Sequence, residues 1–214
     1  MRVTIIGANG STGTEVVRAC HDRGHEVVAA VRRPETVASL AEGLVRVSVA
    51  KIDLNAPESL VAAIDGSDAV VSCLGHGGIK AAAKPTTLYS DSARALRAAM
   101  QETDCRRLLV LSSGGVEFDA AAPWFYTALL RKHLINTYLD MARMETVLEE
   151  SDDLEWTCVR LTYLLDGPSR DYLVRDRVIG EGNFKIHFVD AARFIADELT
   201  DREWIGRHPV LGYP

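Results

Sequence analysis

Three glycines near the start of the chain have a spacing that suits phosphate binding. Gly7, Gly10 and Gly13 follow the apolar residues of an expected strand and precede an amphipathic helical pattern. The amino terminus of a helix carries unpaired N–H groups and a partial positive charge, so its backbone can hold a pyrophosphate where no Cβ blocks the approach. The spacing is Gly-x-x-Gly-x-x-Gly rather than the Gly-x-Gly-x-x-Gly of the familiar dinucleotide fingerprint. A tight turn without a ligand is the competing interpretation.

The residues around these glycines favour the ligand. A strand ends at the first glycine, a helix is expected over 14–20, and a second strand is expected over 25–31. Such a unit of about 30 residues is the context in which a glycine triplet binds a dinucleotide. We therefore expect a nicotinamide dinucleotide at this turn.

Two arginines stand where the second strand ends. Sites selective for NAD usually place an acidic residue there for the ribose 2′-hydroxyl, whereas sites for NADP offer arginine to the 2′-phosphate. This chain has Arg32 and Arg33 and no acidic residue at that place. A guanidinium binds phosphate oxygens in pairs and keeps its charge at any relevant pH, so the pair favours NADPH. The alternative is a solvated pair at a strand end.

Other polar or small residues follow the third and fourth expected strands. Asp53 follows the third strand, where it could accept from the adenine amino group or simply form a local turn. Gly75 follows the fourth strand, where it would let the nicotinamide half of the cofactor pass close to the backbone. His76 comes next and could carry a proton, although a histidine among glycines is more often only exposed.

A serine pair ends the fifth strand and is the best candidate for substrate contact. The hydroxyls of Ser112 and Ser113 could donate to a substrate carbonyl or ring nitrogen without ionising, or they could merely form a turn. None of the six tyrosines has a lysine at the fourth following position. Alcohol oxidation and sugar epimerisation need a base that removes a hydroxyl proton, so the missing pair disfavours both.

Composition limits the remaining possibilities. The chain has 214 residues, 47% of them hydrophobic, which suits a single domain over residues 1–214. The net charge of −6 and the scattered arginines disfavour nucleic acid as a partner. Four widely spaced cysteines in apolar segments indicate reduced core thiols, and we expect no metal site. A strand beginning at residue 2 and the lack of long apolar runs predict a cytoplasmic protein that does not bind membranes.

The pattern along the chain alternates between strands and helices. Strands are expected over 44–49, 69–74, 106–111, 155–161 and 184–188, and helices over 34–40, 57–64, 85–100, 123–151 and 190–199. Asn55 and Asp190 are the expected caps of two of these helices. Such alternation with continuous apolar strands predicts an α/β fold, a single Rossmann-type doubly wound parallel sheet with helices on both faces. Residues from about 155 to 214 would contribute to the substrate pocket.

The chain resembles a known family over nearly its whole length. The resemblance rests on the opening turn, the Val-Arg after the second strand, and the segments Pro85-Thr86-Thr87, Ala98-Ala99-Met100, Arg143-Met144 and Val147-Leu148. These look like the biliverdin-IXβ reductase or flavin reductase family, within the atypical short-chain dehydrogenase/reductase group of NAD(P)H-binding, NmrA-like proteins. That family transfers a hydride from NADPH to a flavin or linear tetrapyrrole and requires no Tyr-Lys pair.

Carried over by position, the resemblance implies roles for particular residues. The implied cofactor contacts are Gly7, Gly10, Ser11, Thr12, Gly13, Arg32, Asp53, Leu74 and Gly75. It also implies that Ser112 and Ser113 face the nicotinamide. Where the family has Pro-Pro-His after the sixth strand, this chain has Leu161-Thr162-Tyr163, preceded by Arg160. That segment would line the substrate site, so Tyr163 becomes a candidate contact and the substrate assignment weakens.

These observations predict an NADPH-dependent reductase of a planar conjugated acceptor such as flavin, with a small molecule as its partner. Two alternatives stay open: an NmrA-like regulator that binds NADP without chemistry, and an NAD(P)-dependent epimerase or isomerase. Trp124 and Phe125 could form a wall of the pocket or belong to the core. Arg170, Arg175 and Arg177 could meet an anionic substrate, although a solvated basic loop is the simpler interpretation. The sequence leaves the oligomeric state open.

Overall fold

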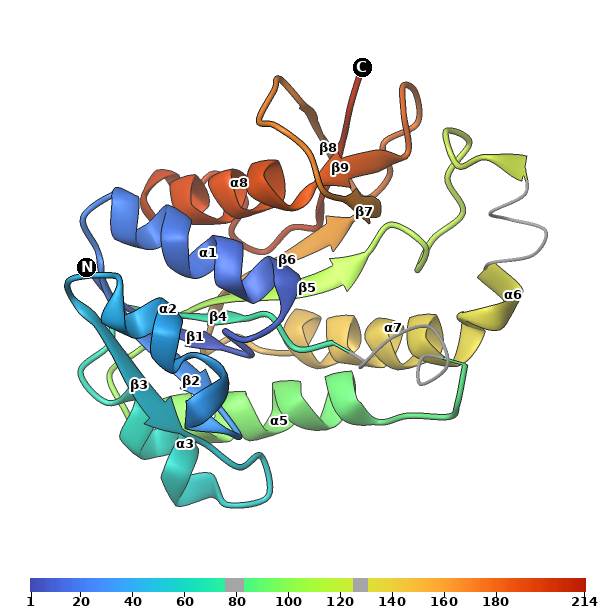
Figure 1. The fold of residues 1–214 in the computed structure, drawn as a ribbon. Coiled ribbons are helices and arrows are strands. Elements are labelled where there is room, and N and C mark those ends of the chain that lie inside the picture. Colours follow the sequence, from blue (N-terminus) through green and yellow to red (C-terminus); the bar gives the residue numbers. More distant parts are fainter. Residues whose placement is uncertain (76–82, 125–130) are drawn as a thin grey trace.

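A computed structural model describes residues 1–75, 83–124 and 131–214 (Figure 1). Its centre is an eight-stranded sheet of order β3-β2-β1-β4-β5-β6-β10-β8. Those strands are β1 (Arg2–Ile6), β2 (Glu26–Val31), β3 (Val47–Lys51), β4 (Ala69–Ser72), β5 (Arg107–Ser113), β6 (Glu155–Leu161), β8 (Leu173–Asp176) and β10 (Pro209–Gly212). All neighbours pair in parallel except β8, which runs antiparallel to β10. The strand order reverses between β1 and β4, which is the switch point where open α/β sheets bind ligands.

Helices cover both faces of the sheet, as the doubly wound prediction requires (Figure 1). On one face lie α1 (Ser11–Asp22), the 3-10 helix η1 (Pro34–Thr36), α2 (Ala38–Glu42) and α8 (Phe188–Asp201). On the other lie α3 (Pro57–Ile64), α5 (Leu88–Gln101) and α7 (Ile135–Glu149), and the short α6 (Arg131–His133) precedes α7. Alternate strand residues supply the two cores: Ile5 packs with α1 and α8, whereas Ile6 packs with α3 and α5. The α/β fold class predicted from the sequence is confirmed.

The carboxyl-terminal part of the chain differs from the prediction. The expected strand over 184–188 is shortened to β9 (Lys185–His187), which pairs with β7 (Tyr163–Leu165) in a separate two-stranded sheet. The true last strand is β10, which extends the main sheet beside β6 and was not predicted. A four-residue segment that starts with proline looks like a turn, because proline cannot donate to a strand ladder.

Both predicted helix caps are wrong. The residue before α3 is Ala56, and Asn55 instead donates its backbone N–H to Asp53 Oδ1 at 2.9 Å. Helix α8 begins at Phe188, so Asp190 lies inside its first turn and is fully buried. The Asp190 carboxylate accepts from Ser169 Oγ at 2.7 Å and from the hydroxyl of Tyr213 at 2.6 Å. Tertiary partners for the carboxylate have replaced the cap.

Within the described residues, no helix has both the length and the apolar composition needed to cross a membrane.

Candidate functional site

The site residues predicted from the sequence gather at one edge of the sheet. Because parallel strands end at the same edge, residues that follow β1, β2, β3, β4, β5 and β6 lie along it (Figure 1). In the order of the chain, these residues are Gly7 to Gly13, Arg32 with Arg33, Asp53, Leu74 with Gly75, Ser113, and Tyr163. The edge brings together all the sequence-predicted cofactor residues, and His76 and Phe125 lie outside the described residues.

Two of the three turn glycines are required by the protein itself. Gly7 has φ +78°, and a Cβ on it would lie 2.9 Å from the carbonyl oxygen of Cys73 in the neighbouring strand segment. A Cβ on Gly13 would lie 2.2 Å from the carbonyl oxygen of Gly7, so α1 can approach the turn only without a side chain there. These contacts hold the start of α1 against the end of β1.

Gly10 and Gly75 are not explained in this way. Gly10 has ordinary extended geometry, φ −77° and ψ 162°, and a Cβ on it would meet only Gly7 O, at 3.5 Å. Around Gly75, a Cβ would have no neighbour within 4 Å among the described residues. Both glycines are exposed. Among the described residues, the backbone at these two glycines is open to the surface.

The first turn of α1 offers free hydrogen-bond donors. Gly10 precedes the helix and makes no side-chain cap, and the N–H of Thr14 is the first to bond back, to Gly10 O at 2.8 Å. The N–H groups of Ser11, Thr12 and Gly13 have no partner within the described parts of the chain. Ser11 is exposed and Thr12 half-buried, so the donors open to solvent. A phosphate at this helix end would satisfy them and meet the positive end of the helix dipole.

The side chains of Arg32 and Arg33 are exposed, and neither makes an ion pair or hydrogen bond to any described residue. The backbone after them is fixed, because the carbonyl of Arg33 accepts from Thr36 N at 3.0 Å and from Thr36 Oγ1 at 2.6 Å. Both guanidinium groups are therefore available to an anion. The free helix donors, the open Gly10 and these two cations together fit a phosphorylated dinucleotide.

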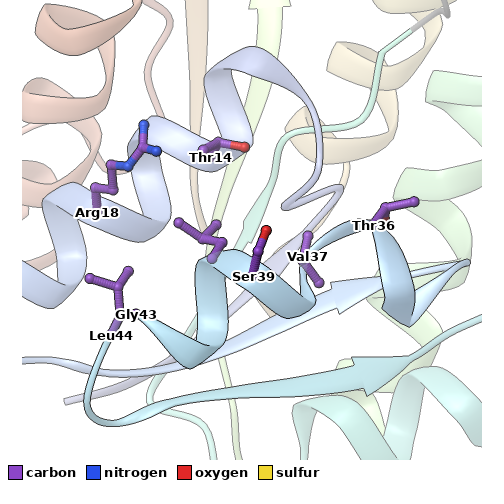
Figure 2. A pocket seen from close by; sticks show the side chains of 8 residues that line it. Thr14, Arg18, Thr36, Val37, Ser39, Gly43 and Leu44 are labelled. Carbon is purple, nitrogen blue, oxygen red and sulfur yellow. The ribbon is translucent and has the colours of Figure 1, made fainter.

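A pocket of about 420 Å³ lies beside this half of the site (Figure 2). Thr14 and Arg18 line it from α1, and Val37, Ser39 and Leu40 line it from the α2 region. It belongs to the end of the molecule built by β2 and β3, whereas Ser113 and Tyr163 follow β5 and the strand beside it. The pocket therefore lies at the β2–β3 end of the sheet and not beside Ser113 and Tyr163.

Asp53 is held in a local turn. Its Oδ1 accepts from the backbone N–H of Asn55 and from Asn55 Nδ2, at 2.9 Å and 3.2 Å. The side chain is exposed at the edge, so the turn and a contact with adenine are compatible. Leu74 is half-buried against the core beneath α3 and α5. It lies directly before the exposed Gly75.

The prediction that both serines face one site is corrected by the structure. Ser112 is 4% exposed and donates its hydroxyl to Glu145 Oε1 of α7 at 2.7 Å. Ser113 is half-buried, and its Oγ accepts from the N–H of Gly115 at 3.1 Å. Consecutive strand residues point to opposite faces, so the two hydroxyls cannot serve the same ligand. Only Ser113 keeps a hydroxyl that can still donate to one.

Tyr163 begins β7 directly beyond the end of β6, and its side chain is 52% exposed. Its backbone N–H donates to Phe184 O at 3.3 Å, while the neighbouring Thr162 hydroxyl donates to Leu211 O at 2.7 Å. The backbone of the segment is therefore fixed to the strands around it. The phenol remains at the surface of the carboxyl edge.

Sequence reasoning missed a buried ionic network beneath the edge. Arg160 is fully buried, and its guanidinium contacts both carboxylate oxygens of Glu145, at 3.0 Å and 2.6 Å. It also lies 3.1 Å from Glu117. Burial lowers the pKa of Arg160, but the two carboxylates outweigh that effect and hold its pKa above the usual range. A signal was available, since Glu145 lies among the apolar core positions Met141, Met144 and Leu148 of one helix.

The three arginines considered for an anionic substrate have internal partners. Arg177 pairs with Glu117 at 2.5 Å, and Arg175 lies 3.8 Å from Glu181. The guanidinium of Arg170 stacks 3.7 Å from the ring centre of Tyr213. Arg175 and Arg177 therefore lie beside carboxylates, whereas Arg170 packs on an aromatic ring.

Comparison with known proteins agrees with this geometry. The profile of the NAD(P)H-binding protein family matches residues 7–202. YwnB of Bacillus subtilis (strain 168), an uncharacterized protein, is 28% identical over 212 residues, which is 95% of this chain and 94% of YwnB. YhfK of the same strain, named an uncharacterized sugar epimerase, is 31% identical over 114 residues, 53% of each protein.

Solved structures of similar fold carry related names. A candidate NADH-flavin reductase from Streptococcus pneumoniae TIGR4 has a TM-score of 0.77 and 23% identity, with all of both chains covered. A short-chain dehydrogenase/reductase from Veillonella parvula DSM 2008 in complex with NADP has a TM-score of 0.77 and 19% identity, covering 100% of this chain and 94% of that one. The match over most of the chain shows that this chain belongs to the NAD(P)H-binding family, and its fold is the Rossmann fold.

Proposed function

We propose that this protein is an NADPH-dependent reductase that passes a hydride to a planar conjugated acceptor such as a flavin. The observation that carries the proposal is the start of α1, where the open backbone at Gly10 adjoins three unpartnered N–H groups. A pyrophosphate is the ligand that such a helix end binds best. Bound there, the cofactor would supply the hydride, and the protein would align donor and acceptor.

The preference for NADPH over NADH rests on Arg32 and Arg33. Both are exposed at the carboxyl end of β2, and neither has a partner within the described residues. Two free guanidinium groups beside the ribose favour a 2′-phosphate, which accepts paired hydrogen bonds from each of them. A solvated pair of arginines would give no preference between the two cofactors.

The choice of acceptor rests on which side chains reach the other end of the edge. Ser113 and Tyr163 offer hydroxyl donors, and no tyrosine has a lysine four residues later. Donors that need not ionise suit an acceptor that takes a hydride on a conjugated ring, whereas oxidation of an alcohol needs a base. The resemblance to flavin reductases and the name of the pneumococcal structure support the same class.

Steady-state oxidation of NADPH with FMN or FAD tests the proposal. We expect consumption that depends on the flavin and is slower with NADH at the same concentration. Cofactor that binds without being consumed, with any flavin or conjugated acceptor offered, would indicate a sensing protein instead. Conversion of a sugar nucleotide without net cofactor consumption would indicate an epimerase, the activity named for YhfK.

A further inference from the structure

Four side chains with metal-binding atoms converge beneath the sheet, on the face covered by α7. They are Glu145 and Glu149 of α7, Cys158 of β6, and His208 directly before β10. Cys158 Sγ lies 3.6 Å from the Glu145 carboxylate, His208 Nε2 lies 3.9 Å from Glu145 Oε2, and one ligand atom from each of these three residues lies within 4.8 Å of the other two. Glu149 Oε1 lies 3.4 Å from the same histidine nitrogen. Ligand atoms bound at roughly 2.0–2.3 Å around one tetrahedral ion are separated by about these distances.

The histidine nitrogen at the centre of this group has no hydrogen bond. His208 is 3% exposed, and its Nε2 is a buried atom without a hydrogen-bond partner in the described structure. Its ring is fixed edge-on to Trp156, with ring centres 5.2 Å apart. A buried ring nitrogen that points at two carboxylates and a thiol is an arrangement that a cation would satisfy.

The surrounding contacts orient one of the carboxylates as metal ligands are oriented. Glu145 Oε1 accepts from Ser112 at 2.7 Å and from Arg160 Nε at 3.0 Å, which fills that oxygen. Glu145 Oε2 accepts from one Arg160 nitrogen at 2.6 Å, and an oxygen of a carboxylate can take a second partner. Hydrogen bonds of this kind from neighbouring groups are the usual support for a ligating carboxylate.

The local charges also accommodate a dication. Arg160 and Arg177 supply two positive charges, against the three negative charges of Glu117, Glu145 and Glu149. A divalent ion that displaces the thiol proton of Cys158 would bring this group to electrical neutrality.

We propose that Glu145, Glu149, Cys158 and His208 form a zinc site that ties α7, β6 and the start of β10 together. Borderline ions such as Zn²⁺ prefer this mixture of thiolate, imidazole and carboxylate in a closed tetrahedral site. Binding forms the Zn–S bond and releases the Cys158 proton to solvent. Glu149 gives the entry path, since its side chain is 45% exposed. The site is structural, because its four ligands lie beneath the sheet and none of them is a residue that the proposed reductase activity uses.

Cobalt substitution tests this site, because Co²⁺ takes the same ligands and is coloured. The protein, stripped with a chelator and titrated with Co²⁺ under reducing conditions, is expected to show a tetrahedral visible spectrum and a thiolate-to-cobalt charge-transfer band at one ion per chain. Zinc added afterwards should abolish both. A wild-type protein whose spectrum lacks the charge-transfer band would overturn the proposal.

Variants with matched controls locate the ion. Cys158→Ser should remove the charge-transfer band, whereas Cys105→Ser, another buried thiol outside the group, should keep it. His208→Gln should weaken binding, whereas His25→Gln should not, although His25 Nε2 is likewise buried without a hydrogen bond. Glu149→Gln, at the surface and safe for folding, should weaken Co²⁺ binding at least about tenfold, with Glu150→Gln as its control. A band that survives in Cys158→Ser, or equal affinity in Glu149→Gln, contradicts the site.

Discussion

Gly10 and Gly13 lie three residues apart and lack side chains for different reasons. A Cβ on Gly13 would lie 2.2 Å from Gly7 O, so the fold itself excludes any other residue. A Cβ on Gly10 would meet only that same oxygen, at 3.5 Å, an ordinary contact. The fold therefore requires glycine at position 13, whereas at position 10 only a bound ligand would require it.

Replacing these two glycines should have opposite effects. Gly10→Val should abolish binding of NADPH while circular dichroism and the free energy of unfolding stay near wild type, because its extended backbone tolerates valine. Gly13→Val should lower the free energy of unfolding, because α1 must move away from the turn. Cofactor titration with thermal unfolding measures both effects. Intact NADPH binding by Gly10→Val would place the cofactor elsewhere.

The arginine pair makes a prediction about cofactor choice. Arg32→Ala with Arg33→Ala should weaken NADPH binding and leave NADH binding nearly unchanged, since each charge-assisted bond to the 2′-phosphate contributes roughly 1.5–3 kcal/mol. Isothermal titration with the two cofactors measures the difference. Arg94→Ala, an exposed arginine of α5 far along the chain, is the control. Equal affinity of the wild type for NADPH and NADH would show that the pair is only solvated.

The two serines should separate stability from turnover. Ser112→Ala removes a buried bond to the Glu145 carboxylate and should cost roughly 1.5–3 kcal/mol in the free energy of unfolding. Ser113→Ala removes only the bond from the Gly115 N–H, so it should lower the free energy of unfolding less than Ser112→Ala does. It should lower turnover about 10-fold to 100-fold, below the ~10²–10⁴ of a removed general acid or base. Tyr163→Phe should mainly change acceptor affinity. Complete loss of turnover in Tyr163→Phe with cofactor still bound would instead identify a tyrosine acid and point to carbonyl reduction.

At the scale of elements, acidic side chains in the segment after β5 bind residues of β6 and of the segment after β8. Glu117 pairs with Arg160 and Arg177, and Asp119 accepts from the N–H groups of Ile179 and Gly180 at 2.6 Å and 3.1 Å. This segment follows Ser113 directly, so the same contacts fix the backbone beside Ser113 at the carboxyl edge of the sheet. Its geometry depends on residues from three separate stretches of chain, which no local pattern in the sequence reveals.

Glu117 should make stability depend on pH. Burial raises the pKa of its carboxyl, but hydrogen bonds from Arg160 and Arg177 outweigh this and hold its pKa below the usual 4.5. A lowered pKa in the folded state means that the stabilisation is present above about pH 4.5 and is lost as the pH falls through the folded value. Urea unfolding of Glu117→Gln should therefore show a deficit near neutral pH that shrinks in acid.

The control for this pH series is Glu35→Gln, in η1, an exposed glutamate without an ion pair among the described residues. Its free energy of unfolding should follow the wild type throughout. A constant deficit of Glu117→Gln across the whole pH range would show that the lost contact is packing and not charge.

At the scale of the whole molecule, the strands up to β6 follow local patterns in the sequence, whereas β7, β8 and β10 do not. The strands β1, β2, β4, β5 and β6 are mostly apolar and almost wholly buried, and such apolar runs are typical of buried parallel strands. In contrast, β7, β8 and β10 have only three or four residues each, and each is stabilised by pairing with a neighbouring strand. Tertiary pairing decided these elements, and no local pattern in the sequence predicts them.

The same contrast applies to the site. Residues of the glycine turn and the strand ends could be found from the sequence, because their positions follow from spacing and from the direction of the strands. The orientation of Ser112 away from Ser113 required only the alternation of side chains along a strand. The network of Arg160, Glu145 and Glu117 could not be predicted from the sequence, because the two glutamates lie 15 and 43 residues from Arg160 along the chain.

The central claim is that the carboxyl edge aligns NADPH with a flavin for direct hydride transfer. Anaerobic mixing of the protein with FMN and NADPH deuterated at the transferred C4 position, compared with unlabelled NADPH, tests it most directly. We expect one flavin reduced for each NADPH consumed, a slower rate with the deuterated cofactor, and no reduction by Gly10→Val. Tight NADPH binding without any flavin reduction would contradict the claim.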